Sequence, residues 1–173
     1  MAARHSTSRF HNKERQPTMT YLKRILLAED NANDLELTLM ALGQHNLANE
    51  VVVTRDGAEA LDYLYRRGSF QMREEGNPAV VLLDLKMPKV DGLEVLRQVK
   101  SDPDLNIIPV VLLTSSSEES DVVKSYELGV NAYVVKPVDF HEFVDAIKEV
   151  GLFWSIINVP PPDTVTTASF SPR

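Results

Sequence analysis

Five short runs of aliphatic residues recur along the chain, and each is followed by a stretch whose apolar residues repeat at helical spacing. The runs are KRILLA from Lys23, VVVT from Val51, AVVLL from Ala79, IPVVLL from Ile108 and AYVV from Ala132. Because polar residues hardly interrupt these runs, we expect strands that are covered on both faces. Parallel strands require helical crossovers, which the intervening stretches can supply. The sequence therefore predicts an α/β fold.

The expected helices begin at recognisable capping signals. An Asn, Asp or Ser precedes a glutamate by three residues in the pairs Asn33/Glu36, Asp56/Glu59, Asp91/Glu94, Ser116/Glu119 and Asp139/Glu142. Such pairs satisfy the free N–H groups of a first helical turn. The apolar stripes that follow, including Val123, Tyr126 and Phe140, are interpreted as core. We expect helices on both faces of a flavodoxin-like, doubly wound sheet of five parallel strands in the order 2-1-3-4-5.

Three segments lie outside this repeat. The segment at 66–78 lengthens the connection before the third strand, and we expect an extension of the second helix followed by a mobile loop. Residues 1–20 are polar and are interpreted as a flexible leader, and residues 159–173 as a Pro-rich disordered tail. The folded domain is expected at 21–158. We expect no attached effector domain, so the output would be a protein contact.

The composition excludes several classes of function. The formal net charge of -7 argues against binding of nucleic acid, because lysine and arginine normally neutralise its phosphates. No run approaches the roughly 18 uncharged apolar residues of a membrane span, and the first residues lack the apolar region of a signal peptide. The absence of cysteine excludes thiolate metal sites. We expect a cytoplasmic protein without membrane contact, in which oxygen or imidazole ligands hold any metal.

Acidic, hydroxyl and basic side chains stand where the expected strands end. Glu29 and Asp30 follow the first strand, Asp84 follows the third, Thr114 ends the fourth and Lys136 follows the fifth. In an open α/β sheet, ligands bind in the crevice outside the carboxyl ends of the strands. Three carboxylates around one point repel one another unless a cation joins them, and a hard oxygen cluster suits Mg²⁺ or Mn²⁺. The sequence therefore predicts a divalent cation site.

A purely structural role is the usual alternative for each of these residues taken alone. A single aspartate after a strand is most often a helix N-cap, and Asp34 and Asp91 are assigned to helix starts on this ground. A single lysine after a strand is usually solvated, but Pro137 restrains Lys136. A cis Lys136–Pro137 bond would aim the ammonium group back into the crevice.

Four segments in this order resemble the signature segments of response-regulator receiver domains. They are AEDN at 28–31, LLDLKMPKVDG at 82–92, VVLLTSS at 110–116 and NAYVVKP at 131–137, and the resemblance covers about residues 22–150. It implies that Asp84 accepts a phosphoryl group from the phosphohistidine of a sensor histidine kinase. It also implies that Asp30, Asp84 and the backbone carbonyl of Lys86 bind the cation, with Glu29 acting through a coordinated water.

The same resemblance implies a switch and a self-catalysed reaction rather than a conventional enzyme. The Thr114 hydroxyl would move to bond a phosphoryl oxygen, Tyr133 would turn into the vacated space, and Lys136 would offset the phosphoryl charge. A structural alternative for Tyr133 is a half-buried aromatic residue with a hydrated hydroxyl. Lys86 and Ser116 flank the expected path of attacking water, and we hypothesise that Lys86 slows loss of the phosphoryl group.

A narrower resemblance is to the stand-alone receivers that partner bacterial phytochromes. It rests on the long loop before the third strand, on SYELGVNAY at 125–133 and on LFW at 152–154 before the Pro-rich tail. It implies a phytochrome as the sensor histidine kinase. It also implies a symmetric homodimer that uses the last strand, the last helix, Phe153 and Trp154. Alternatively, these aromatic residues fold back over the core of their own domain.

Three other classes fit the sequence less well. A haloacid-dehalogenase-like phosphatase also uses an aspartate at a strand end, but it needs a second acid where this chain has Lys86. A flavodoxin-like FMN binder needs a neutral phosphate loop, whereas EDNAND at 29–34 is acidic. A degenerate receiver that serves only as a scaffold would lack some of the acidic, hydroxyl or lysine positions, and none is missing.

Overall fold

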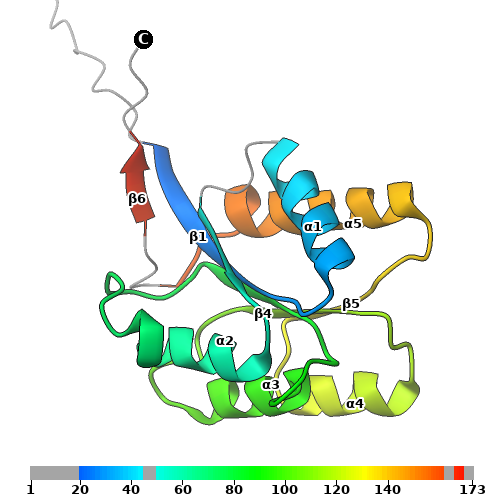
Figure 1. Cartoon of the computed structure of the whole chain (residues 1–173), viewed down its shortest axis with the longest axis horizontal. Coiled ribbons are helices and arrows are strands. Elements are labelled where there is room, and N and C mark those ends of the chain that lie inside the picture. The colour runs from blue at the N-terminus through cyan, green and yellow to red at the C-terminus, as the bar shows by residue number, and fades with distance from the viewer. Residues whose placement is uncertain (1–19, 45–49, 162–165, 170–173) are drawn as a thin grey trace, which may run out of the picture.

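A parallel sheet forms the centre of the molecule (Figure 1). The computed structural model describes residues 20–44, 50–161 and 166–169. The five parallel strands are β1 (Thr20–Ala28), β2 (Glu50–Thr54), β3 (Val80–Leu83), β4 (Val110–Thr114) and β5 (Ala132–Val135). Their order is β2-β1-β3-β4-β5, and every neighbouring pair is parallel. The predicted fold class and strand order are therefore confirmed.

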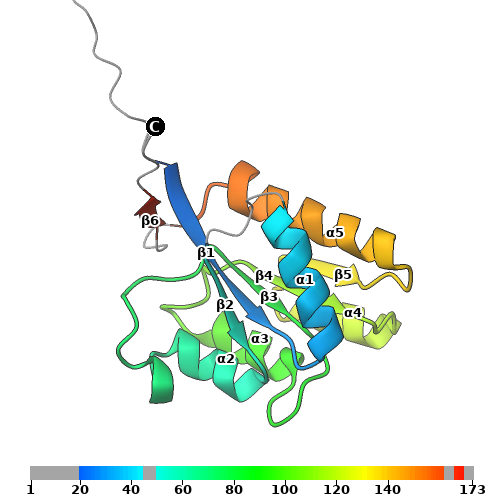
Figure 2. The same ribbon diagram turned by 45° about the horizontal axis from the view of Figure 1, so that its top comes forward.

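Helices cover both faces of this sheet (Figure 2). They are α1 (Ala32–Gln44), α2 (Gly57–Leu64), α3 (Gly92–Ser101), α4 (Glu119–Glu127) and α5 (Phe140–Leu152). α1 packs beside α5 on one face, and α2 and α4 flank α3 on the other. No helix in the described ranges is long and apolar enough to cross a membrane.

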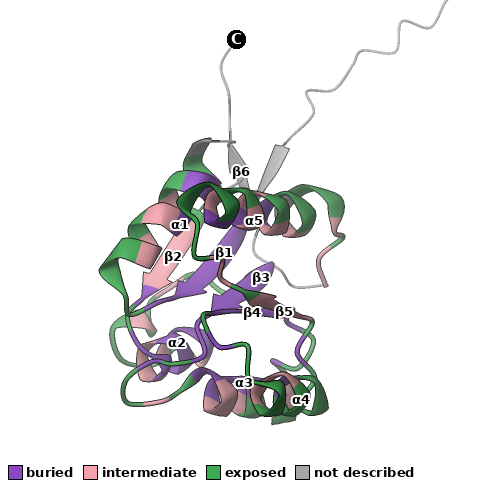
Figure 3. Ribbon diagram, turned by 90° about the vertical axis from the view of Figure 1, so that its right-hand side faces the viewer, coloured by how far each residue is buried: buried purple, intermediate pink, exposed green. Residues whose placement is uncertain are grey.

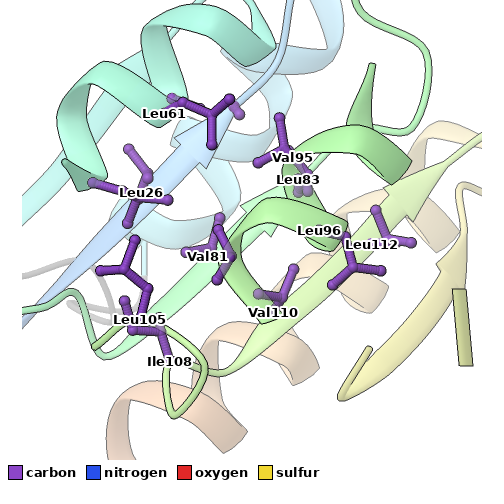
Figure 4. Close-up of a cluster of buried hydrophobic side chains, with 14 of the residues drawn as sticks. Leu26, Leu61, Val81, Leu83, Val95, Leu96, Leu105, Ile108, Val110 and Leu112 are labelled. Carbon is purple, nitrogen blue, oxygen red and sulfur yellow. The ribbon is translucent and has the colours of Figure 1, made fainter. Parts of the chain in front are cut away.

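The strands contribute to two separate hydrophobic clusters, as expected for runs that are covered on both faces. Leu26 of β1 packs with Val81 and Leu61 in one cluster, which Figure 4 shows against α2 and α3. Its neighbour Ile25 packs with Phe143 in the other cluster, between the sheet and the pair α1 and α5. Successive side chains of a strand point to opposite faces, so these uninterrupted aliphatic runs supply both cores.

Three of the five predicted caps are present. The side chains of Asp56, Asp91 and Asp139 accept hydrogen bonds from the backbone N–H groups of Glu59, Glu94 and Glu142. The cap expected at Asn33 is wrong, because Asn31 caps α1 by accepting from Asn33 N and Asp34 N. The cap expected at Ser116 is also wrong, because α4 begins after Glu118 with no side-chain cap.

The segment at 66–78 does not extend α2, which is a correction to the sequence prediction. α2 ends at Leu64, Arg66 adopts a φ of 55°, and a short 3-10 helix, η1 (Gly68–Phe70), follows. A residue in the left-handed region ends a helix because its backbone cannot continue the i to i−4 hydrogen bonds. The guanidinium group of Arg73 then donates hydrogen bonds to the backbone carbonyls of Tyr63 in α2 and of Glu74 and Gly76 in the loop.

Part of the expected core is exposed at α4 and at the start of α5. Val123 is 48% exposed, Tyr126 is 56% exposed and Phe140 is 46% exposed, so their assignment to the core is wrong. Ser125 is the one residue of α4 that is buried. Figure 3 shows that most of α4 is exposed or intermediate. Helical periodicity identifies an apolar face, but it does not reveal whether the domain itself covers that face.

The end of the chain also differs from the sequence expectation. Of the expected leader, only Thr20 lies within the described residues, and it begins β1. In the segment expected to be a disordered tail, β6 (Thr166–Ser169) pairs antiparallel with residues 20–23 of β1. β1 starts four residues before its pairing with β2 begins at Arg24, so an added strand can use the projecting part. A turn of π-helix, η2 (Phe153–Ile157), lies between α5 and β6 in the sequence.

Candidate functional site

The ends of four strands place the candidate residues at one edge of the sheet. The backbone N–H of Glu29 donates to Thr54 O, that of Asp84 to Ala28 O, and that of Lys136 to Thr114 O. Each of these bonds continues the pairing of strands one residue beyond the strand end. The backbone of each functional residue is therefore fixed by the sheet, although its side chain lies in the crevice.

Three carboxylates converge in this crevice, as the sequence predicts. Glu29, Asp30 and Asp84 each offer an oxygen atom, and these oxygens lie within 4.8 Å of one another. Glu29 and Asp84 are buried, whereas Asp30 is exposed. A partly open group of hard oxygen donors fits Mg²⁺ or Mn²⁺, which retain several waters and need few protein ligands. The residues present can therefore hold a divalent cation.

Lys136 occupies the centre of the acidic cluster. Its ammonium group lies 2.6 Å from Glu29 Oε2, 2.8 Å from Asp34 Oδ2 and 3.3 Å from Asp84 Oδ1. Asp34 was assigned only to a helix start, so the sequence prediction missed its contact with the lysine. The Lys136–Pro137 bond is trans, and a cis bond is not needed to aim the side chain inward.

The charges of this cluster do not balance. Burial raises the pKa of Asp84 and of Glu29, and Lys136 offsets only part of this effect. Burial alone would lower the pKa of Lys136, but hydrogen bonds to Asp34 and Glu29 outweigh it and raise the pKa. One ammonium group thus serves several carboxylates and remains protonated. The excess negative charge favours the addition of a cation.

Ser116 connects the end of β4 with β5 and α4. Its backbone N–H donates to Thr114 Oγ1 at 3.1 Å, and its carbonyl accepts from the Tyr133 hydroxyl at 2.9 Å. Its own hydroxyl donates to Asp121 Oδ2 in the first turn of α4 at 2.7 Å. The hydroxyl of Tyr133 is therefore bonded to the protein rather than merely hydrated. The predicted switch residues Thr114 and Tyr133 contact the same residue.

The loop between β3 and α3 is fastened to the start of α2. The Lys89 ammonium donates to Asp56 Oδ2 at 2.5 Å and holds the pKa of Asp56 below its usual range. A Cβ atom on Gly57 would lie 2.0 Å from Val90 O, so the two segments approach too closely for any larger residue. Lys86, whose side chain is exposed, lies in the same loop.

Replacing Lys136 with methionine is expected to destabilise the protein by about 3–5 kcal/mol when no divalent cation is present, because the buried carboxylates lose their ammonium partner. Added Mn²⁺ should raise the unfolding temperature of this variant more than that of the wild type, since the cation replaces the lost charge. Thermal unfolding followed by circular dichroism, with EDTA and with Mn²⁺, measures both effects.

Lys100→Met is the matched control. The Lys100 ammonium donates to the carbonyls of Asn106 and Ile108 and to the side chain of Asn131, and it has no carboxylate partner among the residues that the structure describes. Its loss should lower stability, but Mn²⁺ should not restore it. Equal responses of the two variants to Mn²⁺ would contradict a cation site beside Lys136.

Comparisons with known proteins agree with this arrangement. The response regulator Rcp1 of Synechocystis sp. is 39% identical over 132 residues, which cover 76% of this chain and 88% of Rcp1. The structure of Mn²⁺-bound Rcp1 superposes with a TM-score of 0.76 over 80% of this chain and 99% of that one, at 38% identity. The structure of the phosphorylated cyanobacterial phytochrome response regulator RcpA has a TM-score of 0.76 and 41% identity, and it covers 81% and 99% of the two chains.

A bacteriophytochrome response regulator, RtBRR, is 68% identical, with a TM-score of 0.66 over 83% of this chain and 86% of that one. The family model of the response regulator receiver domain matches residues 25–148. This range contains every residue of the acidic cluster, together with Thr114, Tyr133 and Lys136. The chain therefore belongs to the response regulator receiver domain family.

Proposed function

We propose that this chain is a single-domain response regulator that accepts a phosphoryl group on Asp84 and acts in the cytoplasm through protein contacts. The observation that carries the proposal is the buried carboxylate of Asp84, 3.3 Å from Lys136 and grouped with Glu29 and Asp30. The receiver domain would span 21–158. It would act as a signalling switch whose phosphorylation and dephosphorylation are self-catalysed.

The reaction follows from the positions of these side chains. An oxygen of Asp84 attacks the phosphorus of a phosphohistidine, the P–N bond breaks, and an acyl phosphate forms as the imidazole leaves. A bound divalent cation would neutralise charge on the phosphoryl oxygens, held by Asp30, Asp84 and the carbonyl of Lys86. Lys136 would supply a second positive charge to the phosphoryl group. Both oxygens of Glu29 already accept hydrogen bonds, which suits a role through a coordinated water.

Phosphorylation would then shift the contacts of Thr114 and Tyr133. Thr114 Oγ1, which now accepts from Ser116, would bond a phosphoryl oxygen. Ser116 accepts a hydrogen bond from Tyr133 through its carbonyl and donates one to Asp121 of α4 through its hydroxyl. A movement of Thr114 would therefore alter the contacts of α4 through Ser116. The exposed Val123 and Tyr126 of α4 lie on the surface that would change.

The similarity to RtBRR and RcpA supports a phytochrome as the sensor histidine kinase. The test is transfer of label from purified, autophosphorylated phytochrome kinases in the presence of Mg²⁺, compared with a histidine kinase of an unrelated pathway. Rapid labelling by the phytochrome kinase and slow labelling by the unrelated kinase is the expected result. Equal rates from both kinases would contradict this partnership.

Lys86 is expected to prolong the phosphorylated state, because it follows the acceptor by two residues and its exposed side chain could cover the phosphoryl group. Lys86→Asn should lose the phosphoryl group about threefold faster, a change of less than ~1 kcal/mol in the activation barrier. The decay of labelled protein after removal of the kinase measures this rate. Lys148→Asn on α5 is the control, and an unchanged lifetime in Lys86→Asn would end the hypothesis.

A symmetric homodimer is proposed through the region after α5. Phe153 is 46% exposed and Ile156 is 62% exposed, whereas Trp154 is half-buried and packs on the cluster beneath α1 and α5. Trp154 therefore packs on the core of its own domain, whereas Phe153 is available for contact with a partner. Phe153→Glu should convert a dimer into a monomer in sedimentation velocity at about 50 µM protein. Ile107→Glu, at an exposed site before β4, should leave the dimer intact, and a monomeric wild type would refute the proposal.

A further inference from the structure

Asp34 stands apart from the carboxylates that can hold a cation. The oxygens of Glu29, Asp30 and Asp84 lie within 4.8 Å of one another, and Asp34 does not belong to this group. It nevertheless contacts Lys136, whose ammonium nitrogen lies 2.8 Å from Asp34 Oδ2. Neither the phosphoryl transfer nor the switch described above gives this carboxylate a role.

The first turn of α1 fixes the position of Asp34. Its backbone N–H donates to the capping oxygen Asn31 Oδ1 at 3.2 Å, and its carbonyl accepts from the hydroxyl of the buried Thr38 at 2.7 Å. α1 in turn packs beside α5 on one face of the sheet (Figure 2). Because both backbone groups of Asp34 are bonded, a rigid element rather than a loop brings its side chain to Lys136.

The carboxylates around the Lys136 ammonium group are not equivalent partners. The group donates hydrogen bonds to Glu29 at 2.6 Å and to Asp34 at 2.8 Å, whereas its ion pair with Asp84 is longer, at 3.3 Å. The lysine therefore contacts the phosphoryl acceptor least closely. An ammonium group has three N–H donors, so a donor that loses its partner becomes available to the remaining carboxylates.

The exposure of these carboxylates decides which contact Lys136 can give up most easily. The side chain of Asp34 is 34% exposed, whereas those of Glu29 and Asp84 are 4% and 10% exposed. A cleft of about 290 Å³, lined by Asp34, Lys136 and Phe140 among others, lies between α1 and the start of α5. Water in this cleft can solvate Asp34 after the lysine leaves, which is not possible for a buried carboxylate. Asp34 is thus the partner that Lys136 exchanges at the lowest cost.

We propose that Asp34 is a positioning residue that holds Lys136 in the crevice until the phosphoryl group arrives. While Asp34 engages one donor of the ammonium group, the oxygens of Asp84 remain accessible to a cation and to the phosphoryl donor. After transfer, Lys136 would leave Asp34 for a phosphoryl oxygen and keep its bond to Glu29. This inference deepens the proposed function and rests on it, because it assumes phosphoryl transfer to Asp84.

Asp34→Asn removes the charge that attracts Lys136 and keeps the size of the side chain. The lysine should then move toward Glu29 and Asp84 and occupy oxygens that a cation needs. We expect the affinity of the full chain for Mn²⁺ to fall about three- to tenfold. Electron paramagnetic resonance of the unbound Mn²⁺ during a titration measures this affinity without any phosphoryl transfer.

Glu36→Gln is the matched control. Glu36 lies two residues farther along α1 and is exposed, and residues at this spacing do not share a side of a helix. The substitution removes the same charge from the same helix, so its affinity for Mn²⁺ should stay within about twofold of the wild type. Equal affinities of Asp34→Asn and Glu36→Gln would overturn the inference.

The Lys136→Met background separates positioning of the lysine from the charge of Asp34 alone. In a chain that has no lysine to hold, Asp34→Asn should change the affinity for Mn²⁺ by less than about twofold. Circular dichroism in the presence of Mn²⁺ checks that each variant is folded. An equal loss of affinity in both backgrounds would mean that Asp34 acts only through its charge, which would overturn the positioning role.

Labelling by a histidine kinase separates this inference from the proposed function. Asp34→Asn should be labelled slowly at low Mg²⁺ and at nearly the wild-type rate at saturating Mg²⁺, because excess cation competes with the lysine for Asp84. If the wild type accepts label and Asp34→Asn shows no dependence on Mg²⁺ beyond that of the wild type, the inference is wrong and the proposed function stands. If Asp84→Asn accepts label like the wild type, the proposed function is wrong and the inference falls with it.

Discussion

Replacing Asp84 with asparagine is expected to abolish phosphoryl transfer from a sensor histidine kinase, with a loss of about a thousandfold or more. The amide has nearly the shape of the carboxylate, but it lacks the anionic oxygen that attacks phosphorus. Lys136 would keep its contacts with Glu29 and Asp34, so the crevice should retain its form. Transfer of label from an autophosphorylated kinase in the presence of Mg²⁺ measures the effect.

The same substitution has a second expected consequence, on stability. Burial raises the pKa of Asp84, so its ionised form at neutral pH opposes folding. Asp84→Asn should therefore unfold at a higher temperature than the wild type in EDTA. It should also gain less stability from Mn²⁺, because one of the three grouped carboxylates is lost.

Asp91→Asn is the control for both measurements. Asp91 caps α3 by accepting from Glu94 N, and asparagine caps a helix about as well as aspartate. This variant should accept label and unfold like the wild type. Label that still reaches Asp84→Asn at the wild-type rate would mean that another residue is the acceptor.

The sheet and its order could be predicted because each strand carries its own signal. Val81 packs on one face of the sheet and Val111 on the other, so the strands are apolar on both faces. Few folds other than a parallel sheet covered by helices accommodate this pattern. Caps were predictable at Asp56, Asp91 and Asp139, where the helix begins immediately after the acid. The cap predictions were wrong at α1, where Asn31 rather than Asn33 is the cap, and at α4, which begins after Glu118 without a side-chain cap.

The convergence of Glu29, Asp30, Asp84 and Lys136 followed from the ends of parallel strands, where the topology fixes the position. Asp34 was missed for a physical reason. It lies in the first turn of α1, where an acid is favourable for the helix alone, and only the packing of α1 beside the crevice brings it to Lys136.

A different limit applies to the exposed apolar residues. The pattern of α4 resembles that of a core helix, yet Val123 and Tyr126 are about half exposed. A sequence that must cover a core and a sequence that must present a surface to a partner have the same helical spacing. Only the structure separates these two cases, and it places Val123 and Tyr126 on the helix whose first turn accepts a hydrogen bond from Ser116 through Asp121.

Gly92→Ala should be strongly destabilising. An added Cβ would lie 2.3 Å from the backbone oxygen of Asp84 and 2.9 Å from Leu85 Cα, and neither backbone atom can move independently of β3. Gly92 N also donates to Leu85 O at 2.8 Å, so the start of α3 is tied to the acceptor strand. We expect a loss of about 3 kcal/mol or more in the free energy of unfolding, measured by urea denaturation.

The matched control is Gly43→Ala in α1, where a Cβ would meet nothing within 4 Å. Alanine is favoured over glycine inside a helix, so this variant should gain up to about 1 kcal/mol. If the two Gly→Ala changes alter the free energy of unfolding in opposite directions, close packing rather than helix propensity requires glycine at position 92. Because the displaced atom belongs to Asp84, Gly92→Ala should also slow labelling by the kinase in the fraction that remains folded. If Gly92→Ala is as stable as Gly43→Ala and is labelled at the wild-type rate, the start of α3 does not position the acceptor.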